Sequence, residues 1–319
     1  MNRHKKVFDQ LRHLTTERRN SRSLHIDVLP IHETLKLINR EDQKVAASVG
    51  REIRFIAKAV AVIVHSFREG GRLVYVGAGT SGRLGILDAA ECPPTYGTKP
   101  STVQGVIAGG RRSVFRSMEG VEDSERMGSR DMKKLRLQSS DVVCGIAASM
   151  RTPYVIAALR EAKRQKAKTI FVTTNSRNML NQKQFSGLRR MIDVAICPVV
   201  GPEVIMGSTR MKSGTAQKMV LNMMTTVAMI QLGKVYENMM VDLKMKSTKL
   251  RERAKRVVMN ATGADYKTAS NALSKADGHA KTAIVMIKCN INAAQARSRL
   301  QKANGFVRYA ITGILPRSG

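Results

Sequence analysis

Five short apolar segments alternate with helical or turn-rich stretches between residues 73 and 199, and this alternation constrains the fold more than any other feature of the sequence. Strand-like runs separated by helices are typical of right-handed crossovers and a mostly parallel sheet. The predicted strands are residues 73–76, 103–108, 142–147, 169–173 and 194–199. We therefore expect an α/β fold with a five-stranded parallel sheet flanked by helices.

Helical patterns precede and follow the predicted sheet. Apolar residues recur at helical spacing between residues 31 and 64, whereas residues 14–23 are polar and are typical of an arm or loop. Beyond residue 250, short helical stretches separated by Gly and Asn indicate a small helical subdomain. We expect three parts: an N-terminal arm with helices at 1–58, a sheet domain at 59–243 and a C-terminal helical subdomain at 244–319.

The chain is strongly basic, with 55 Lys and Arg against 24 Asp and Glu and a formal net charge of +31. The basic residues are spread along helix faces, without a tight basic run or the aromatic platforms that single-stranded nucleic acid binding uses. We interpret the charge as a solvated, uniformly basic surface rather than a nucleic-acid site. Such a surface would steer anionic substrates towards the protein.

The four cysteines are far apart, form no CxxC pair and lack the Cys/His spacing of a zinc site. They are typical of buried free thiols in a reducing compartment, so we expect a cytoplasmic protein without a metal site. No apolar run approaches the roughly 18 residues that a membrane span needs, and we expect no membrane partner.

The first predicted strand leads through the turn Gly77-Ala-Gly-Thr-Ser-Gly82 into a helix. A helix N-terminus offers unpaired N–H groups and partial positive charge, and glycines let an anion come close. The spacing is GxGxxG, but no acidic residue is placed convincingly to bind a ribose, and the GK[ST] of a P-loop is absent. The hydroxyls of Thr80 and Ser81 suit a phosphate monoester. From these residues alone, a tight turn without a ligand is an equal alternative.

Two more turns carry hydroxyl groups: Ser149 to Thr152 after the third predicted strand, and Gly207 to Arg210 before a Met-rich helix. The carboxyl ends of parallel strands share one edge of a sheet, where open α/β sheets bind ligands. We therefore expect the turns to converge on one phosphate. The predicted phosphate-binding residues are Gly79, Thr80, Ser81, Ser149, Thr152, Ser208 and Thr209.

Two acids stand out. Glu91 closes the helix that starts at the first turn, so one helix would run from the phosphate site to this carboxyl group. Glu122 lies in the acidic connector Glu119-Gly-Val-Glu-Asp-Ser124. Carboxylates can act as general acid and base when their surroundings keep one of them protonated. Taken in isolation, each Glu is more typical of a solvated surface residue than of a catalytic group.

These motifs together resemble the N-acetylmuramic acid 6-phosphate etherases, a family of the sugar isomerase (SIS) superfamily. The resemblance extends over essentially the whole chain, with the motifs in the family's order. The matching segments are LTTERRN at 14–20, GAGTSGRLGILDAAECPPTYG at 77–97, GVIAGG at 105–110, EGVEDS at 119–124, GIAASMRTPYV at 145–155 and GPEVIMGSTRMKSGTAQKMVLNMMTT at 201–226.

The resemblance implies a SIS fold and a lyase that cleaves the D-lactyl ether of N-acetylmuramic acid 6-phosphate, in cell-wall peptidoglycan recycling. The reaction would eliminate D-lactate across C2–C3 of the open-chain aldehyde and then add water, without a metal or other cofactor. By motif position, Glu91 matches the family's proton donor and Glu122 its second catalytic acid/base. The resemblance also implies a homodimer whose active sites use both subunits. The Met-rich helix at 218–232 is apolar nearly all round, which indicates either a packed centre or a subunit interface.

One departure and two alternatives accompany this interpretation. Met150 stands where the family's turn usually has Gly, which would matter if the position requires a positive φ. A non-catalytic regulator that binds sugar phosphates is the first alternative, and the presence of both Glu91 and Glu122 favours turnover instead. A sugar-phosphate isomerase is the second alternative, and the ECPPTYG and EGVEDS segments favour the etherase.

Overall fold

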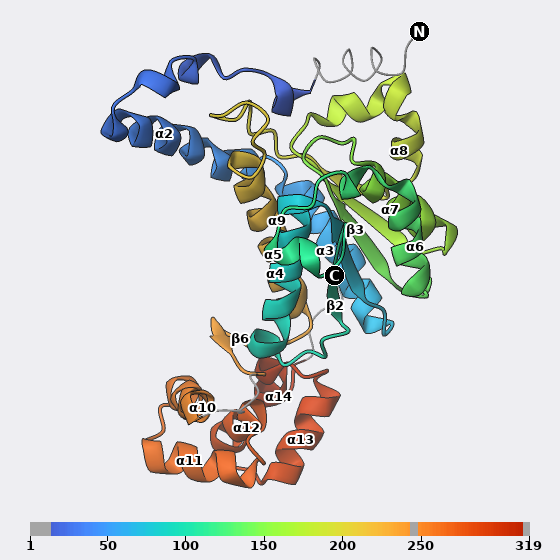
Figure 1. Ribbon diagram of the computed structural model, residues 1–319. Helices are drawn as coiled ribbons and strands as arrows, with labels where there is room; N and C mark the ends of the chain where they lie inside the picture. Colours follow the sequence, from blue (N-terminus) through green and yellow to red (C-terminus); the bar gives the residue numbers. More distant parts are fainter. Residues whose placement is uncertain (1–13, 243–247, 315–319) are drawn as a thin grey trace. The chain divides into compact units, whose positions relative to one another are not determined.

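The computed structural model describes residues 14–242 and 248–314 (Figure 1). The chain folds into two compact units. The first comprises Met1–Ala90 with Ser101–Thr225, and the second comprises Glu91–Pro100 with Thr226–Gly319. Within the described ranges, no helix has the length and apolar character needed to cross a membrane.

A five-stranded parallel sheet forms the centre of the first unit, as the alternating apolar segments predict. The strands are β1 (Leu73–Gly77), β2 (Val103–Ile107), β3 (Val142–Ile146), β4 (Lys168–Val172) and β5 (Val194–Ile196). Their order is β2-β1-β3-β4-β5, and every neighbouring pair is parallel. Strands β1 and β3 are buried at every residue, because a parallel sheet is covered on both faces.

Helices cover both faces of this sheet (Figure 1). The α-helices that lie wholly or partly in the first unit are α2 (Ile31–Gly50), α3 (Ile53–Arg68), α4 (Gly79–Tyr96), α5 (Arg112–Phe115), α6 (Glu125–Lys134), α7 (Pro153–Arg164), α8 (Ser186–Arg190) and α9 (Lys212–Gln231). Short 3-10 helices are η1 (Thr15–Glu17), η2 (Ser21–Ser23), η3 (Ile26–Val28), η4 (Val121–Asp123), η5 (Arg177–Asn181) and η6 (Lys183–Phe185).

The two faces of β1 carry different contacts, as the two-residue period of a strand requires. Val74 and Val76 belong to a buried core with residues of α6 and α7. On the other face, the Tyr75 hydroxyl donates a hydrogen bond to Oδ2 of Asp88 on α4, at 2.9 Å. Helix α4 lies close to the sheet because Gly105 has no side chain: a Cβ there would lie 2.7 Å from the Cα of Ile86.

The Met-rich helix α9 is largely buried within the chain. Val220, Leu221 and Met224 have no exposed surface, whereas Val227 and Ile230 are about two-fifths exposed (39% and 41%). Of the two interpretations of its apolar character, a packed centre or a subunit interface, this burial within the chain supports the packed centre.

The second unit holds the predicted small helical subdomain. Its helices are α10 (Thr248–Thr262), α11 (Tyr266–Lys275), α12 (Ala280–Cys289), α13 (Ala293–Lys302) and α14 (Val307–Thr312), with a hairpin of β6 (Val235–Tyr236) and β7 (Met239–Met240). They enclose a separate apolar core. Asn290 takes a left-handed conformation that ends α12, and Asn292 forms a capping box with Gln295 that begins α13.

A buried ionic cluster centred on Asp242 fixes α12 within this unit. Oδ2 of Asp242 lies 2.8 Å from the Nζ atoms of both Lys234 and Lys281, and His279 Nε2 lies 3.7 Å from Oδ1. Burial alone would raise the pKa of Asp242, but the contacts with His279, Lys281 and Lys234 outweigh it and lower the pKa to about 2.

Protonation of Asp242 should therefore contribute to acid unfolding. A depressed pKa stabilises the fold at pH values above the unfolded pKa of about 4, by about 2–3 kcal/mol, and this contribution is lost as the pH falls towards 2. In urea unfolding, the stability difference between wild type and Asp242→Asn should shrink between pH 6 and pH 2.5. Asp277→Asn, which changes an exposed carboxylate, is the control. A constant difference for Asp242→Asn would contradict this role.

Candidate active site

The predicted hydroxyl-bearing turns meet at the carboxyl edge of the sheet, around a pocket of about 310 Å³. The pocket belongs entirely to the first unit. Of the predicted phosphate residues, Gly79, Thr80, Ser81, Ser149, Thr152 and Thr209 line it. Ser208 does not line the pocket, although its neighbours Gly207 and Thr209 do.

The turn after β1 is tight, and it places the N-terminus of α4 at the pocket. A Cβ on Gly77 would lie 2.6 Å from the backbone N of Gly82, so a side chain there would collide with the turn. Gly79 begins α4 with a φ of +54°, and Thr80 and Ser81 follow in the first helical turn. The unpaired N–H groups and the positive end of the helix dipole therefore lie beside two hydroxyls, which suits an anion.

Ser81 has a buried partner behind the pocket. Its hydroxyl donates to Oε1 of Gln217 on α9 at 2.9 Å, and Gln217 is 1% exposed. The Nε2 group of Gln217 has no hydrogen-bond partner within the described residues. The contact joins α4 to α9 and fixes the position of Ser81 at the helix start.

The turn after β3 has the backbone conformation that makes Met150 unusual. Met150 has a φ of +61°, in the left-handed region that favours glycine, and its side chain is fully buried in the core. The question raised by the sequence is thus answered: the position does require a positive φ, and a Met occupies it with its side chain packed inwards. Ser149 and Thr152, on either side, still line the pocket.

The acidic connector brings Glu122 to the same pocket. Glu122 is the middle residue of η4, which begins directly after Gly120, and its side chain is half-buried. Gly120 has a φ of +78°. Glu119 also lines the pocket but is exposed. Arg83 on α4 holds the end of α5, which precedes this connector, because its guanidinium donates to the backbone carbonyls of Val114 and Arg116 at 2.9 and 3.3 Å.

Glu91 lies on α4, the helix that begins with the phosphate turn, so a single helix carries Thr80, Ser81 and Glu91. Its side chain is exposed, and it belongs to the part of α4 that is in the second unit.

Glu17 and Ser113 are two of the pocket residues that were not predicted from the sequence. Glu17 comes from the N-terminal arm, which its polar composition suggested was only a loop, yet it lines the pocket. Ser113 is 3% exposed and lines the pocket, and its Oγ has no hydrogen-bond partner within the described residues. Glu17 lies within the LTTERRN motif, so the motif was the available signal for it, whereas no sequence pattern marks Ser113.

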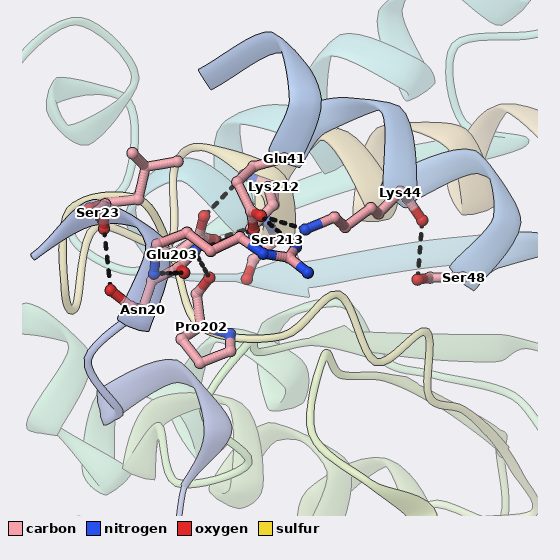
Figure 2. A network of polar contacts seen from close by, with 11 residues as sticks. Asn20, Ser23, Glu41, Lys44, Ser48, Pro202, Glu203, Lys212 and Ser213 are labelled. Carbon is pink, nitrogen blue, oxygen red and sulfur yellow. Dashed lines mark hydrogen bonds and ion pairs between the residues drawn. The ribbon is translucent and has the colours of Figure 1, made fainter. Parts of the chain in front are cut away.

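A buried polar network fixes the arm against α2 and the start of α9 (Figure 2). Lys212 is 1% exposed, and its Nζ lies 2.7 Å from Oε2 of Glu41, which also accepts a hydrogen bond from Nδ2 of Asn20 at 2.9 Å. Burial would raise the pKa of Glu41, but the contacts with Lys212 and Asn20 lower it. Glu203 accepts from the backbone N–H groups of Lys212 and Ser213 at 3.0 and 2.9 Å, which satisfies the N-terminus of α9.

The charges of the pocket differ from those of the whole chain. Glu17, Glu119 and Glu122 line it, and Arg83, which is engaged with backbone carbonyls, is the sole Lys or Arg among the lining residues. An anion would therefore be held by hydroxyl and backbone N–H groups, with carboxylates left for the rest of the ligand. In the part of the chain that the structure describes, no group of three or more His, Cys, Asp or Glu side chains could hold a metal ion.

The chain is similar over nearly its full length to proteins named N-acetylmuramic acid 6-phosphate etherase. It is 56% identical over 308 residues to that of Salinibacter ruber, covering 96% of each chain. It is 50% identical over 304 residues to that of Photorhabdus laumondii, covering 95% of this chain and 98% of the relative.

Two further likenesses concern the sheet domain. Residues 55–163 match the family model described as the glucokinase regulatory protein N-terminal SIS domain. Among solved structures, the chain is similar to a phosphoheptose isomerase from Neisseria gonorrhoeae, with a TM-score of 0.45 and 14% identity, covering 62% of this chain and 99% of that one.

Replacing Met150 by Gly should destabilise the protein despite relieving the left-handed strain. Loss of a buried Met costs about 2–5 kcal/mol, and removing the strain returns about 1–2 kcal/mol, so the free energy of unfolding should fall by about 1–3 kcal/mol. Lys166 is the matched control because it has a φ of +63° but an exposed side chain. Lys166→Gly should stay within about 1 kcal/mol of wild type. Equal stability of the two variants in urea unfolding would show that burial does not hold Met150 in place.

Proposed function

The chain belongs to the N-acetylmuramic acid 6-phosphate etherase family, and we propose that it cleaves the D-lactyl ether of N-acetylmuramic acid 6-phosphate. The full-length likeness to relatives of that name carries the proposal. The protein is then a carbon–oxygen lyase that converts the sugar phosphate and water into N-acetylglucosamine 6-phosphate and D-lactate, in cell-wall peptidoglycan recycling.

The reaction needs one base and one acid. A base removes the C2 proton of the open-chain aldehyde, whose carbonyl group acidifies that position. The C3–O bond then breaks, an acid protonates the departing lactate oxygen, and a C2=C3 double bond forms. Water adds back across this bond, with OH at C3 and H at C2, so no oxidant or reductant is consumed.

We assign these two roles to Glu91 and Glu122. Glu122 is half-buried and lines the same pocket as the phosphate turns, which supports its action near a bound sugar. Glu91 is assigned by its position in the family's motif. The phosphate is assigned to the start of α4 and to the turns of Ser149 and Thr209, because their hydroxyls line this pocket.

We further propose a cytoplasmic homodimer with active sites at the subunit interface. Four exposed apolar side chains on the N-terminal segment support such a contact. They are Leu24 (42% exposed), Val28 (75%) in η3, and Ile31 (82%) and Leu35 (59%) in the first turns of α2. A second copy of the chain is the partner that the family resemblance implies.

The decisive experiment is incubation with N-acetylmuramic acid 6-phosphate followed by an assay for released D-lactate. Release of D-lactate with formation of N-acetylglucosamine 6-phosphate supports the proposal. The match to the regulatory-protein SIS domain makes a non-catalytic sugar-phosphate-binding regulator the second candidate. Binding of the sugar phosphate without release of lactate would favour that candidate and would refute turnover.

Removing either proposed acid–base group should strongly slow the reaction. Glu91→Ala and Glu122→Ala should each lower kcat by a factor of roughly 10² or more, because general acid–base catalysis contributes about that much. Glu125→Ala changes a nearby exposed carboxylate on α6 and is the control. Full activity of Glu91→Ala or Glu122→Ala in the lactate assay would remove that residue from the mechanism.

Removing the Ser81 hydroxyl should affect binding rather than chemistry. Ser81→Ala should raise KM by about 10-fold with little change in kcat, because the hydroxyl would contact the phosphate and not the reacting carbons. Ser208→Ala is the matched variant, since Ser208 does not line the pocket, and its KM should remain within about twofold of wild type. A lower kcat with unchanged KM in Ser81→Ala would contradict the phosphate assignment.

A further inference from the structure

The N-terminal arm is a fixed part of the pocket wall. Leu14 is fully buried and Thr16 is 2% exposed. The backbone N–H of Thr15 donates to Oδ1 of Asn175 at 2.8 Å, a contact between positions 160 residues apart. Further along, Asn20 joins the buried network of Lys212 and Glu41 (Figure 2). Contacts on both sides of Glu17 therefore determine where its side chain lies.

The Glu17 carboxylate lies at the turn that carries Thr209. A Cβ on Gly207 would lie 3.8 Å from Oε2 of Glu17, and both residues line the pocket. The contact recorded for the carboxylate is a long hydrogen bond of 3.4 Å from its neighbour Thr16 to Oε1. Across residues 14–242 and 248–314, no Lys, Arg or His nitrogen approaches it within the 4 Å of an ion pair. Its oxygens thus keep unused capacity to accept hydrogen bonds from a ligand.

A carboxylate beside phosphate-binding turns repels a bound phosphate. Its presence favours binding only if it also forms an attractive contact with another part of the same ligand. Burial lowers the pKa of Arg151, and the negative charge of Glu17 partly counteracts this, so Glu17 interacts electrostatically with the turn between Ser149 and Thr152. A sugar phosphate offers carbon-bound hydroxyl groups near its phosphate ester, at C4 of the closed ring and also at C5 of the open chain, whereas inorganic phosphate has only the P–OH groups of the phosphate itself. A carboxylate accepts such hydroxyl protons in strong, charge-assisted hydrogen bonds.

We propose that Glu17 is a substrate-binding residue that accepts a hydrogen bond from a sugar hydroxyl next to the phosphate. It thereby selects sugar phosphates over inorganic phosphate. The inference deepens the proposed function, since it rests on the assignment of this pocket to a sugar phosphate. It gives the arm a direct part in recognition, beside the catalytic roles assigned to Glu91 and Glu122.

The test compares two ligands in Glu17→Gln, a substitution of nearly the same shape without the charge. Affinity for N-acetylglucosamine 6-phosphate is measured by calorimetric titration, and affinity for inorganic phosphate by competition in the same titration. The variant should bind the sugar phosphate about 10-fold more weakly, because a charge-assisted hydrogen bond is lost. It should bind inorganic phosphate unchanged or a few-fold more tightly, because a repelling charge is gone.

Two further variants separate recognition from simple damage to the arm. Asn20→Ala removes a buried contact that anchors the arm, and it should lower the affinity for both ligands. Glu33→Gln changes an exposed carboxylate on α2 that pairs with Lys36, and it should leave both affinities unchanged. Thermal unfolding of every variant checks that the fold is retained.

Weaker binding of the sugar phosphate, with unchanged or tighter binding of inorganic phosphate, supports the inference. If Glu17→Gln weakens the binding of both ligands, as Asn20→Ala is expected to do, the proposed role of Glu17 is overturned. The same holds if Glu17→Gln changes neither affinity. In both cases the proposed function still stands. If the wild-type protein binds neither ligand, both the sugar-phosphate site and the inference are refuted. If it binds the sugar phosphate but releases no lactate, only the proposed lyase activity is refuted.

Discussion

The buried ion pair between Lys212 and Glu41 is the interaction on which the pocket depends. Lys212 begins α9, directly after the turn of Gly207 and Thr209, and Glu41 lies on α2 and binds Asn20 of the arm. Glu203 completes the junction by satisfying the backbone N–H groups at the start of α9. A buried charge without its partner is costly, so these segments can take up their positions only together. The third hydroxyl-bearing turn and the arm with Glu17 are thereby fixed at the carboxyl edge of the sheet.

The electrostatics of the site reverse those of the chain. A protein with a net charge of +31 lines the pocket at its sheet edge with three carboxylates and a single Arg, whose guanidinium donates to the backbone carbonyls of Val114 and Arg116. The start of α4 supplies N–H groups, hydroxyls and a helix dipole, which hold an anion without a Lys or Arg. In the proposed function, this leaves the carboxylates for proton transfer and for sugar hydroxyls. The basic exterior would then attract anionic substrates, and the proposed role of Glu17 would distinguish among them.

Local rules and tertiary packing conflict at Met150. The turn requires a left-handed backbone, for which glycine is the usual residue, and the chain places a Met there whose side chain fills the core. The sequence raised this conflict as a departure from the family motif but could not resolve it, because φ is not encoded by one residue. The same limit applied to α9: its all-round apolar character suggested a packed centre or a subunit interface, and only the structure shows that much of that surface is buried within the chain.

The sequence by itself determined the five parallel strands, the helical subdomain and the hydroxyl-bearing turns, because apolar periodicity and turn chemistry act over a few neighbouring residues. It also determined the family, through motifs spread along the whole chain. Only the tertiary structure decided that Glu17 and Ser113 line the pocket and that Ser208 does not. These outcomes depend on segments that lie far apart in the sequence, such as Thr15 and Asn175, and meet only when the core closes. No pattern within either segment specifies where its partner will lie.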